Sequence, residues 1–244
     1  MSGYYEAMRK TRLDEENLVE SIDSRAPSSA LVRLPVPHPT PAMLARTEPL
    51  QQLCERLSPL AVIGNDLRLL ITGCRPQDGA STVAAAFALD FSQRLALRTL
   101  LIDGNLRRPT LHRTFARSNM HPAELMLEGP LQIRSTGWSW LDLATCYLGA
   151  TESERREALK RCDEVSSRYA AVVVDLGVAR LDARMLPLAR ETDPILLVAR
   201  YGHTLRQELA TTAASLRAAK RSLAGVILNA AAKPAAPSTG KKRQ

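Results

Sequence analysis

The segment that most constrains the fold of this 244-residue chain is LLITGCRPQDGASTVAAAFALDF, residues 69–91. A short apolar run is followed by a turn that contains Gly73 and Gly79. Ser81 and Thr82 then open a pattern in which apolar residues recur about every four positions, which is typical of a helix with one buried face. A buried strand, a glycine-containing turn and a helix in this order form a phosphate-binding loop, because the N–H groups of the turn and the helix N-terminus face the anion.

The loop departs from the strict phosphate-binding pattern at its cation. In G-x-x-x-x-G-K-[ST], the lysine contacts the terminal phosphates and the hydroxyl residue holds Mg²⁺. Here Ala80 stands where the lysine belongs, and the first glycine of the pattern falls on Cys74. No lysine occurs between Lys10 and Lys160, so Arg75 in the turn is kept as an alternative cation.

The missing cation is expected to weaken binding less than turnover. A hydrogen bond to a charged group contributes roughly 1.5 to 3 kcal/mol, so nucleotide affinity should fall by about one to two powers of ten. A cation beside a transferring phosphoryl group changes the rate by on the order of 10³ to 10⁵. We therefore expect weak binding of ATP or ADP with Mg²⁺ and assign no confident catalytic residue. The expected nucleotide-binding residues are Gly73, Pro76, Asp78, Gly79, Ala80, Ser81 and Thr82.

Strand and helix patterns alternate along the rest of the chain. We expect strands at 67–72, 98–103, 140–146, 170–175, 194–200 and 224–229, and helices at 80–95, 152–168, 180–190 and 204–220. Such alternation predicts an α/β fold, a parallel sheet with helices on both faces, in the three-layer α/β/α arrangement of P-loop NTPases. Trp138 and Trp140, on the way into one strand, are expected to pack in the core or at its rim.

Composition divides the chain into four parts. Residues 1–25 are charged and helix-like, residues 26–49 form a Pro-rich linker, residues 50–230 form the P-loop NTPase-like domain, and residues 231–244 form a basic disordered tail. A helix at Leu50–Leu60 is expected to pack outside this domain.

Charge and hydropathy exclude several classes of protein. The net charge of +8 falls to +4 for residues 47–230, so a DNA-binding face is not indicated. No apolar run approaches the roughly 18 residues that cross a bilayer. The four cysteines are far apart and no secretory signal is evident, so the reducing cytoplasm is the expected compartment. The basic tail is either a solubilising segment or a contact to acidic lipid or nucleic acid.

Two aspartates stand at the ends of expected strands, where α/β sheets bind ligands. Asp103 ends RTLLID and Asp175 ends AAVVVD. A carboxylate beside a phosphate loop holds Mg²⁺ directly or through its water shell, so Ser81, Asp103 and Asp175 are the expected magnesium residues. The alternative is that each aspartate only ends its strand and caps the next segment of the chain.

Residues 45–230 resemble the bacterial tyrosine kinases (BY-kinases) of capsule and exopolysaccharide biosynthesis. These kinases are a branch of the MinD/ParA-like P-loop ATPases. The most specific element is LLIDGNLRRPTLHRTF, which is similar to the family's Asp-x-Asp-x-Arg-x-Pro motif. The matching positions are Asp103, Leu106, Arg107, Pro109 and His112. The resemblance implies a surface for partners or phosphate at Arg107, Arg108 and Pro109.

The departures from the family fall on its chemistry. Ala80 replaces the loop lysine, Asn105 replaces the second aspartate of the motif, and Gln77 replaces a loop glycine. An amide neither acts as a general base nor carries charge. The family's C-terminal tyrosine cluster is absent, since the last tyrosine is Tyr201. The family's Glu-x-x-Arg-x-x-Arg oligomer motif is also missing before the loop, so a ring of the family type is not expected, while another form of homo-oligomer stays open.

The resemblance implies a degenerate, catalytically impaired subunit of an exopolysaccharide biosynthesis and export system. Such a subunit would be cytoplasmic and peripheral to the inner membrane, as a scaffold or regulator of a membrane polysaccharide co-polymerase (Wzz-like). Two alternatives stay open. One is an active ATPase or protein-tyrosine kinase of the same pathway that uses Arg75 or a partner's lysine. The other is a MinD/ParA-like positioning ATPase held at a membrane by its tail.

Overall fold

One mostly parallel sheet runs through the part of the chain that the computed structural model describes, which is residues 33–34, 40–57, 67–105, 109–115, 131–146, 151–178, 189 and 193–231. Its strands are β1 (Arg33–Leu34), β2 (Leu67–Gly73), β3 (Thr99–Asp103), β4 (Leu131–Ser135), β5 (Leu141–Cys146), β6 (Ala171–Asp175), β7 (Pro194–Arg200) and β8 (Ser222–Ala231). Their order is β1-β8-β7-β2-β6-β3-β5-β4, and only β4 pairs antiparallel, with β5.

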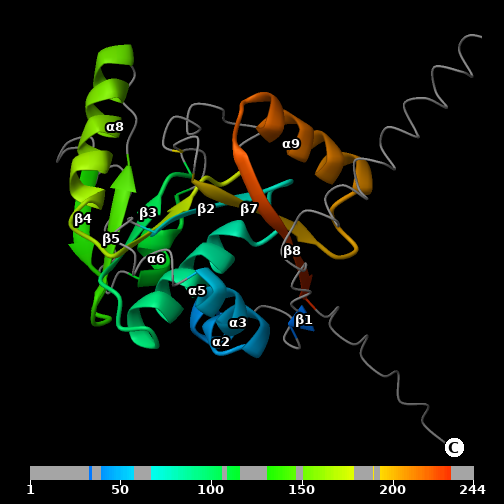
Figure 1. The fold of residues 1–244 in the computed structure, drawn as a ribbon, viewed down its shortest axis with the longest axis horizontal. Helices are drawn as coiled ribbons and strands as arrows, with labels where there is room; N and C mark the ends of the chain where they lie inside the picture. Colours follow the sequence, from blue (N-terminus) through cyan, green and yellow to red (C-terminus); the bar gives the residue numbers. More distant parts are fainter. Residues whose placement is uncertain are drawn as a thin grey trace, which may run out of the picture.

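Helices cover both faces of this sheet (Figure 1). They are α2 (Pro41–Ala45), α3 (Glu48–Leu57), α5 (Ala80–Gln93), α6 (Leu111–Phe115), α8 (Glu152–Ser166) and α9 (Arg206–Ala218). In Figure 1, α8 and α9 lie on one side of the strands, and α2, α3 and α5 lie on the other. The predicted three-layer α/β/α fold is confirmed.

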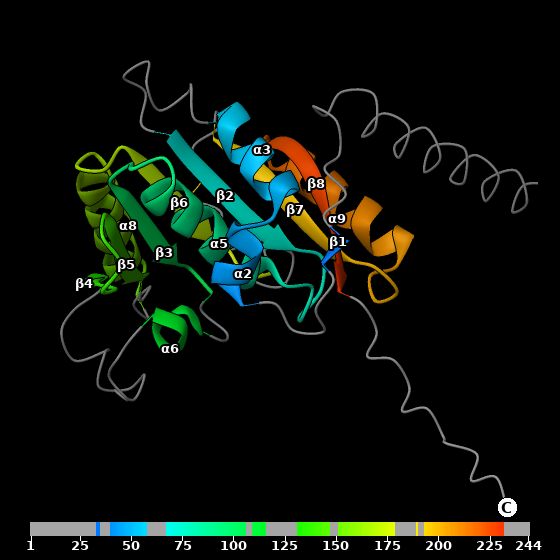
Figure 2. The same cartoon turned by 90° about the horizontal axis from the view of Figure 1, so that it is seen from below.

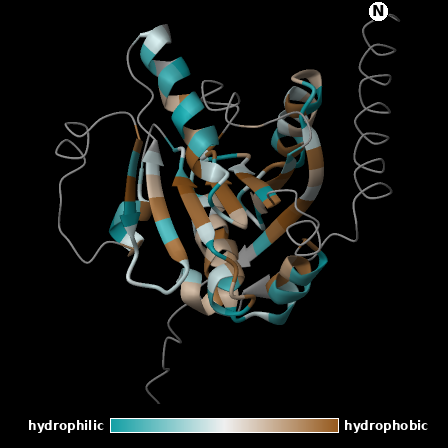
Figure 3. Ribbon diagram, turned by 60° about the vertical axis from the view of Figure 1, so that its left-hand side comes forward, coloured by the Kyte–Doolittle hydropathy of each residue, from teal (hydrophilic) through white to brown (hydrophobic). Residues whose placement is uncertain are grey.

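The two apolar cores explain why the central strands read as continuous hydrophobic runs. Side chains alternate across a strand, so Leu69 and Ile71 pack on the α5 side while Leu70 packs on the α8 and α9 side. Helix α5 is buried along most of its length, with the rings of Phe87 and Phe91 tilted by 52° to each other at a centroid distance of 6.0 Å. Figure 3 shows the contrast between the hydrophobic central strands and the hydrophilic outer face of α8.

Two sequence predictions of structure need correction. Part of the predicted 26–49 linker packs on the domain: it contains β1 and α2, and Leu44 is 2% exposed. The helix expected to pack outside the domain is α3, which buries Leu50 and Cys54 in the core. Strand β4 was not predicted, because it is an edge strand whose alternating residues are only partly buried.

Several predicted segments lie outside the described residues. They are residues 1–25, the tail from residue 232 onward, and the helix at 180–190 except for Ala189. The tail prediction began at residue 231, but Ala231 is the last residue of β8. No helix in the described part of the chain has the length and hydropathy that a bilayer span requires.

Candidate phosphate-binding site

The turn between β2 and α5 has the backbone of an anion-binding loop. Gly79 caps the N-terminus of α5 with φ of 95° and ψ of 17°, a left-handed conformation that favours glycine. A Cβ atom at Gly79 would also collide with the side-chain amide nitrogen of Asn229. Glycine is therefore required at this position both by its backbone conformation and by the close approach of β8.

Ala80 is the first residue of α5 and is 7% exposed. A Cβ atom built at Gly73 would lie 3.6 Å from Ala80 Cβ, so the alanine methyl group faces the start of the loop. The position that a lysine would need is thus inside the loop, and the residue there carries no charge.

Asp78 braces the loop from within. Its Oδ2 accepts hydrogen bonds from the N–H groups of Cys74 (3.1 Å) and Arg75 (2.8 Å), and its Oδ1 accepts one from the Thr204 hydroxyl (2.7 Å). The backbone carbonyl of Asp78 accepts from Asn229 Nδ2 at 2.9 Å. Burial raises the pKa of the Asp78 carboxyl, and these hydrogen bonds oppose that shift.

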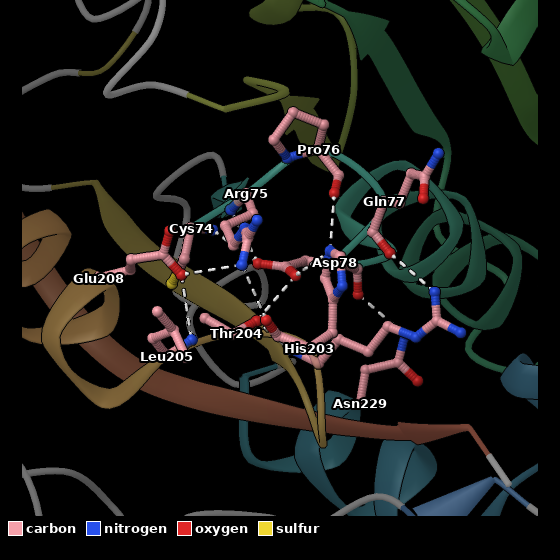
Figure 4. Close-up of polar contacts among 11 residues, drawn as sticks. Cys74, Arg75, Pro76, Gln77, Asp78, His203, Thr204, Leu205, Glu208 and Asn229 are labelled. Atoms are coloured by element: carbon pink, nitrogen blue, oxygen red, sulfur yellow. Dashed lines mark hydrogen bonds and ion pairs between the residues drawn. The ribbon is translucent and has the colours of Figure 1, made fainter. Parts of the chain in front are cut away.

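The turn between β7 and α9 supplies the other side of this brace (Figure 4). His203 Nε2 lies 3.2 Å from the carbonyl oxygen of Pro76 and 4.0 Å from Asp78 Oδ1. The Thr204 hydroxyl oxygen, besides donating to Asp78, accepts from the N–H group of Arg200 at 2.8 Å. Pro76 and Asp78, predicted to bind nucleotide, therefore also tie the loop to the turn that precedes α9.

Arg75 points toward this turn and α9. Its Nη1 donates to the carbonyl oxygen of His203 at 3.0 Å and lies 3.4 Å from Glu208 Oε2. Arg75 thus has a carboxylate partner, and its use as a substitute for the missing lysine requires these contacts to break. A different arginine, Arg200, lies with Nη1 3.5 Å from the carbonyl oxygen of Gln77 at the rim of the loop.

The two strand-end aspartates lie side by side, as the sequence predicts. Asp103 of β3 and Asp175 of β6 are register partners on adjacent parallel strands. Asp175 Oδ1 accepts from the Gly177 N–H group at 2.8 Å and the carboxylate also bonds the Ser81 side chain, while its Oδ2 is buried without a hydrogen-bond partner. The carboxylate of Asp103 accepts from the N–H groups of Asn105 (3.2 Å) and Leu111 (3.0 Å).

Burial raises the pKa of both carboxyls, and the charge of Asp175 adds to the shift at Asp103. Desolvation, followed by the charge of Asp175, raises the pKa of Asp103 to about 7. Desolvation also raises the pKa of Asp175. Two buried carboxyls on neighbouring strands favour either a shared proton or a cation, because their charges are otherwise uncompensated.

The donor set fits Mg²⁺ in part. Hard oxygen ligands suit this ion, which keeps several of its waters and binds through one or two carboxylates. Ser81 and the unpartnered Oδ2 of Asp175 meet that requirement directly, whereas both oxygens of Asp103 already accept backbone N–H groups. Asp103 therefore suits a contact through the water shell.

The chain is similar to bacterial tyrosine kinases. It is 28% identical over 173 residues to tyrosine-protein kinase YwqD of Bacillus subtilis, which covers 66% of this chain and 71% of that protein. It is 26% identical over 175 residues to tyrosine-protein kinase etk of Escherichia coli, which covers 68% of this chain but only 24% of that protein. No family model matches the sequence.

Solved structures also include a bacterial tyrosine kinase domain that is similar to this chain. The kinase domain of Escherichia coli tyrosine kinase ETK superposes with a TM-score of 0.65 at 25% identity, covering 80% of this chain and 78% of that one. A ParA family ATPase from Chlorobium tepidum shares the fold, with a TM-score of 0.50 at 18% identity over 67% of this chain and 74% of that one. The chain is therefore similar to BY-kinases in both sequence and structure, and it has the fold that these proteins share with a ParA family ATPase. Relative to the BY-kinase pattern, the departures that bear on phosphoryl transfer are those at Ala80 and Asn105.

Asn105, which stands in place of the second aspartate of the BY-kinase motif, packs against a glycine just beyond the end of β6. A Cβ atom at Gly177 would lie 2.7 Å from Asn105 Cγ, and Gly177 has φ of 60°. The carbonyl oxygen of Gly177 accepts from the N–H group of Gly73 at 2.8 Å and from the Thr72 hydroxyl at 3.1 Å. Gly177 therefore joins the acidic pair to the base of the loop.

The predicted partner surface is only partly described. Arg107 and Arg108 lie outside the described residues, whereas Pro109 is partly exposed just before α6. Sequence reasoning missed Arg200, Thr204 and Asn229. Arg200 and Asn229 lie at or near the carboxyl ends of β7 and β8, so the rule that found the two aspartates applies to them as well.

Proposed function

We propose that this chain is a cytoplasmic, catalytically impaired BY-kinase-like subunit of an exopolysaccharide biosynthesis and export system. Its role is that of a scaffold or regulator of a membrane polysaccharide co-polymerase. The observation that carries the proposal is the start of α5, where Ala80 occupies the lysine position while Arg75 is held by His203 and Glu208.

Loss of the lysine cation affects the rate of phosphoryl transfer more than it affects the stability of the fold. The transition state of phosphoryl transfer is stabilised by positively charged groups that are already in position at the site. Ala80 supplies no cation at the start of α5, and the nearby Arg75 is held by His203 and Glu208. By contrast, the sheet, its two cores and the brace at Asp78 are intact, which supports a role that needs the fold but not phosphoryl transfer.

Weak nucleotide binding is the residual activity that the site supports. Ser81 and Asp175 retain the groups for Mg²⁺, and the N-terminus of α5 retains an anion-binding backbone. In this proposal ATP or ADP with Mg²⁺ is a structural or regulatory ligand. The nucleotide is bound without being consumed, and docking does not require it.

The experiment measures ATP hydrolysis and autophosphorylation of the full chain, alone and with the cytoplasmic segments of the co-polymerase. Phosphotyrosine is expected to stay at the background level both with and without these segments. Co-purification with the co-polymerase is expected to be equal for the native chain and Asp175→Asn. ATP-dependent phosphotyrosine that Asp175→Asn abolishes would contradict impairment. Failure of both proteins to bind the co-polymerase would contradict the scaffold role.

A second candidate, an ATPase completed by a partner's cation, is favoured by the unpartnered Asp175 Oδ2. A buried, unsatisfied carboxylate oxygen is costly unless a ligand uses it. This candidate predicts that hydrolysis appears only when the partner is added and is lost in Asp175→Asn. Hydrolysis that is absent with the partner present excludes it.

A further inference from the structure

Both tryptophans of the chain lie in the turn between β4 and β5, and both are exposed. Trp138 is 42% exposed and Trp140 is 60% exposed, so the predicted packing in the core or at its rim is wrong for these residues. Aromatic side chains of this size carry a large apolar area, and their clustering at a surface marks a site of interaction.

Hydrogen bonds hold the backbone of the turn that carries the tryptophans. The Thr136 hydroxyl accepts from the N–H group of Trp138 at 3.2 Å, and Gln93 at the end of α5 donates from Nε2 to the carbonyl oxygen of Ser139 at 2.5 Å. Trp140 has φ of 63°. This left-handed conformation costs a non-glycine residue roughly 1 to 2 kcal/mol.

Two arginines lie beside this turn. The carbonyl oxygen of Trp140 accepts from the N–H group of Thr99 at 2.8 Å, which places Arg98 next to the tryptophans. The carbonyl oxygen of Arg98 in turn accepts from the N–H group of Ala170 at 2.8 Å, which brings Arg168 to the same end of the sheet. Both arginines are exposed.

The neighbouring carboxylates have partners within the fold. Asp142 is partly buried and accepts from the Tyr169 hydroxyl at 2.9 Å. Asp163, at the end of α8, pairs with the buried Arg68 at 2.9 Å. Among the described residues near the turn, Trp138, Trp140, Arg98 and Arg168 are exposed, and the guanidinium of Arg98 lies over the Tyr169 ring at 4.9 Å from its centroid.

This surface lies at the opposite end of the sheet from the phosphate loop. The β4–β5 turn precedes β5, at the amino ends of the parallel strands, whereas the loop comes after the carboxyl end of β2. The hairpin stands at one edge of the sheet (Figure 2). A ligand bound at this turn leaves the nucleotide site open.

We propose that the tryptophan surface, formed by Trp138, Trp140, Arg98 and Arg168, binds the anionic phospholipid headgroups of a bilayer. Indole rings are stable at the boundary between headgroups and acyl chains, and arginine is attracted to anionic lipid. A hairpin turn suits shallow insertion, and the flanking arginines supply charge complementarity. The inference does not depend on the proposed function, because it concerns neither the loop nor its ligand.

The test uses the full chain and vesicles of equal parts phosphatidylglycerol and phosphatidylcholine. Since Trp138 and Trp140 are the only tryptophans, their emission reports directly on the surface. Vesicles are expected to shift the emission to the blue. Trp138→Ser combined with Trp140→Asn should lower the partition coefficient by about tenfold, and Arg98→Gln by about fivefold; both are measured by co-sedimentation with vesicles, because the first variant has no tryptophan emission. Asparagine is chosen because it tolerates the left-handed backbone.

Matched controls separate the surface from the rest of the chain. Tyr201→Ser removes another exposed aromatic, beyond β7 at the opposite end, and should leave binding unchanged. A variant with Lys241, Lys242 and Arg243 changed to Gln should keep the blue shift, and thermal unfolding confirms that each variant is folded. Equal binding to pure phosphatidylcholine, or binding without an emission shift, overturns the proposal. So does an emission shift that depends on protein concentration without vesicles, which assigns the surface to a second copy.

Discussion

Thr204 donates a hydrogen bond of 2.7 Å to the carboxylate of Asp78, and this contact joins the phosphate loop to the turn before α9. The Asp78 carboxylate also accepts two N–H groups of its own loop, so it fixes the loop and the turn as one unit. The shape of the anion-binding backbone therefore depends on residues more than 120 positions apart in sequence.

Removal of this bond is expected to loosen the loop. Thr204→Val leaves Asp78 without its hydroxyl partner, and a hydrogen bond to a charged group contributes about 1.5 to 3 kcal/mol. The free energy of unfolding should fall by about that amount in chemical denaturation, and hydrogen exchange at residues 74–79 should quicken. Thr211→Val, on the exposed side of α9, is the control and should change neither. Unchanged loop exchange in Thr204→Val would show that the brace is dispensable.

The glycine at the helix start is expected to tolerate no side chain. Gly79→Ala combines a left-handed backbone with a collision against Asn229 and should cost more than about 2 kcal/mol. Gly202→Ala is the matched control, since its φ is 69° and no atom lies within 4 Å of an added Cβ. Thermal unfolding should therefore show the larger loss for Gly79→Ala. Equal losses would mean that Asn229 moves aside freely.

The acidic pair predicts a pH dependence of stability. Burial and Asp175 raise the folded pKa of Asp103 from 3.8 to about 7, so between these values the folded protein binds more protons than the unfolded one. The free energy of unfolding should fall as the pH rises through this window. Asp175→Asn should flatten the slope and raise stability at pH 8, by on the order of 2 kcal/mol.

Denaturation curves at several pH values, with and without Mg²⁺, check this dependence. Mg²⁺ should stabilise the native chain at pH 8 and leave Asp175→Asn unchanged. Glu157→Gln, on the exposed face of α8, should retain the native slope. A slope as steep in Asp175→Asn as in the native chain would assign the dependence to other groups.

The sequence predicted most of the structure that local patterns determine. Apolar runs located the central strands, and Asp103 and Asp175 were placed together because parallel strands end at one edge. Contacts between distant segments were not predictable. The direction of Arg75 depends on His203 and Glu208, and the exposure of Trp140 depends on how the β4–β5 turn closes. Edge strand β4 was not predicted from the sequence because its residues are only partly buried.

The central claim, that the missing loop cation impairs transfer, is tested most directly by Ala80→Lys. Calorimetric titration with Mg²⁺ and ATP, together with a hydrolysis assay, compares the native chain, Ala80→Lys and Ala80→Gln. Ala80→Gln adds length without charge at a position that is 7% exposed. We expect weak binding and background hydrolysis in the native chain, affinity higher by about one to two powers of ten in Ala80→Lys, and no gain in Ala80→Gln. Native hydrolysis well above background that Ala80→Lys leaves unchanged would contradict the claim.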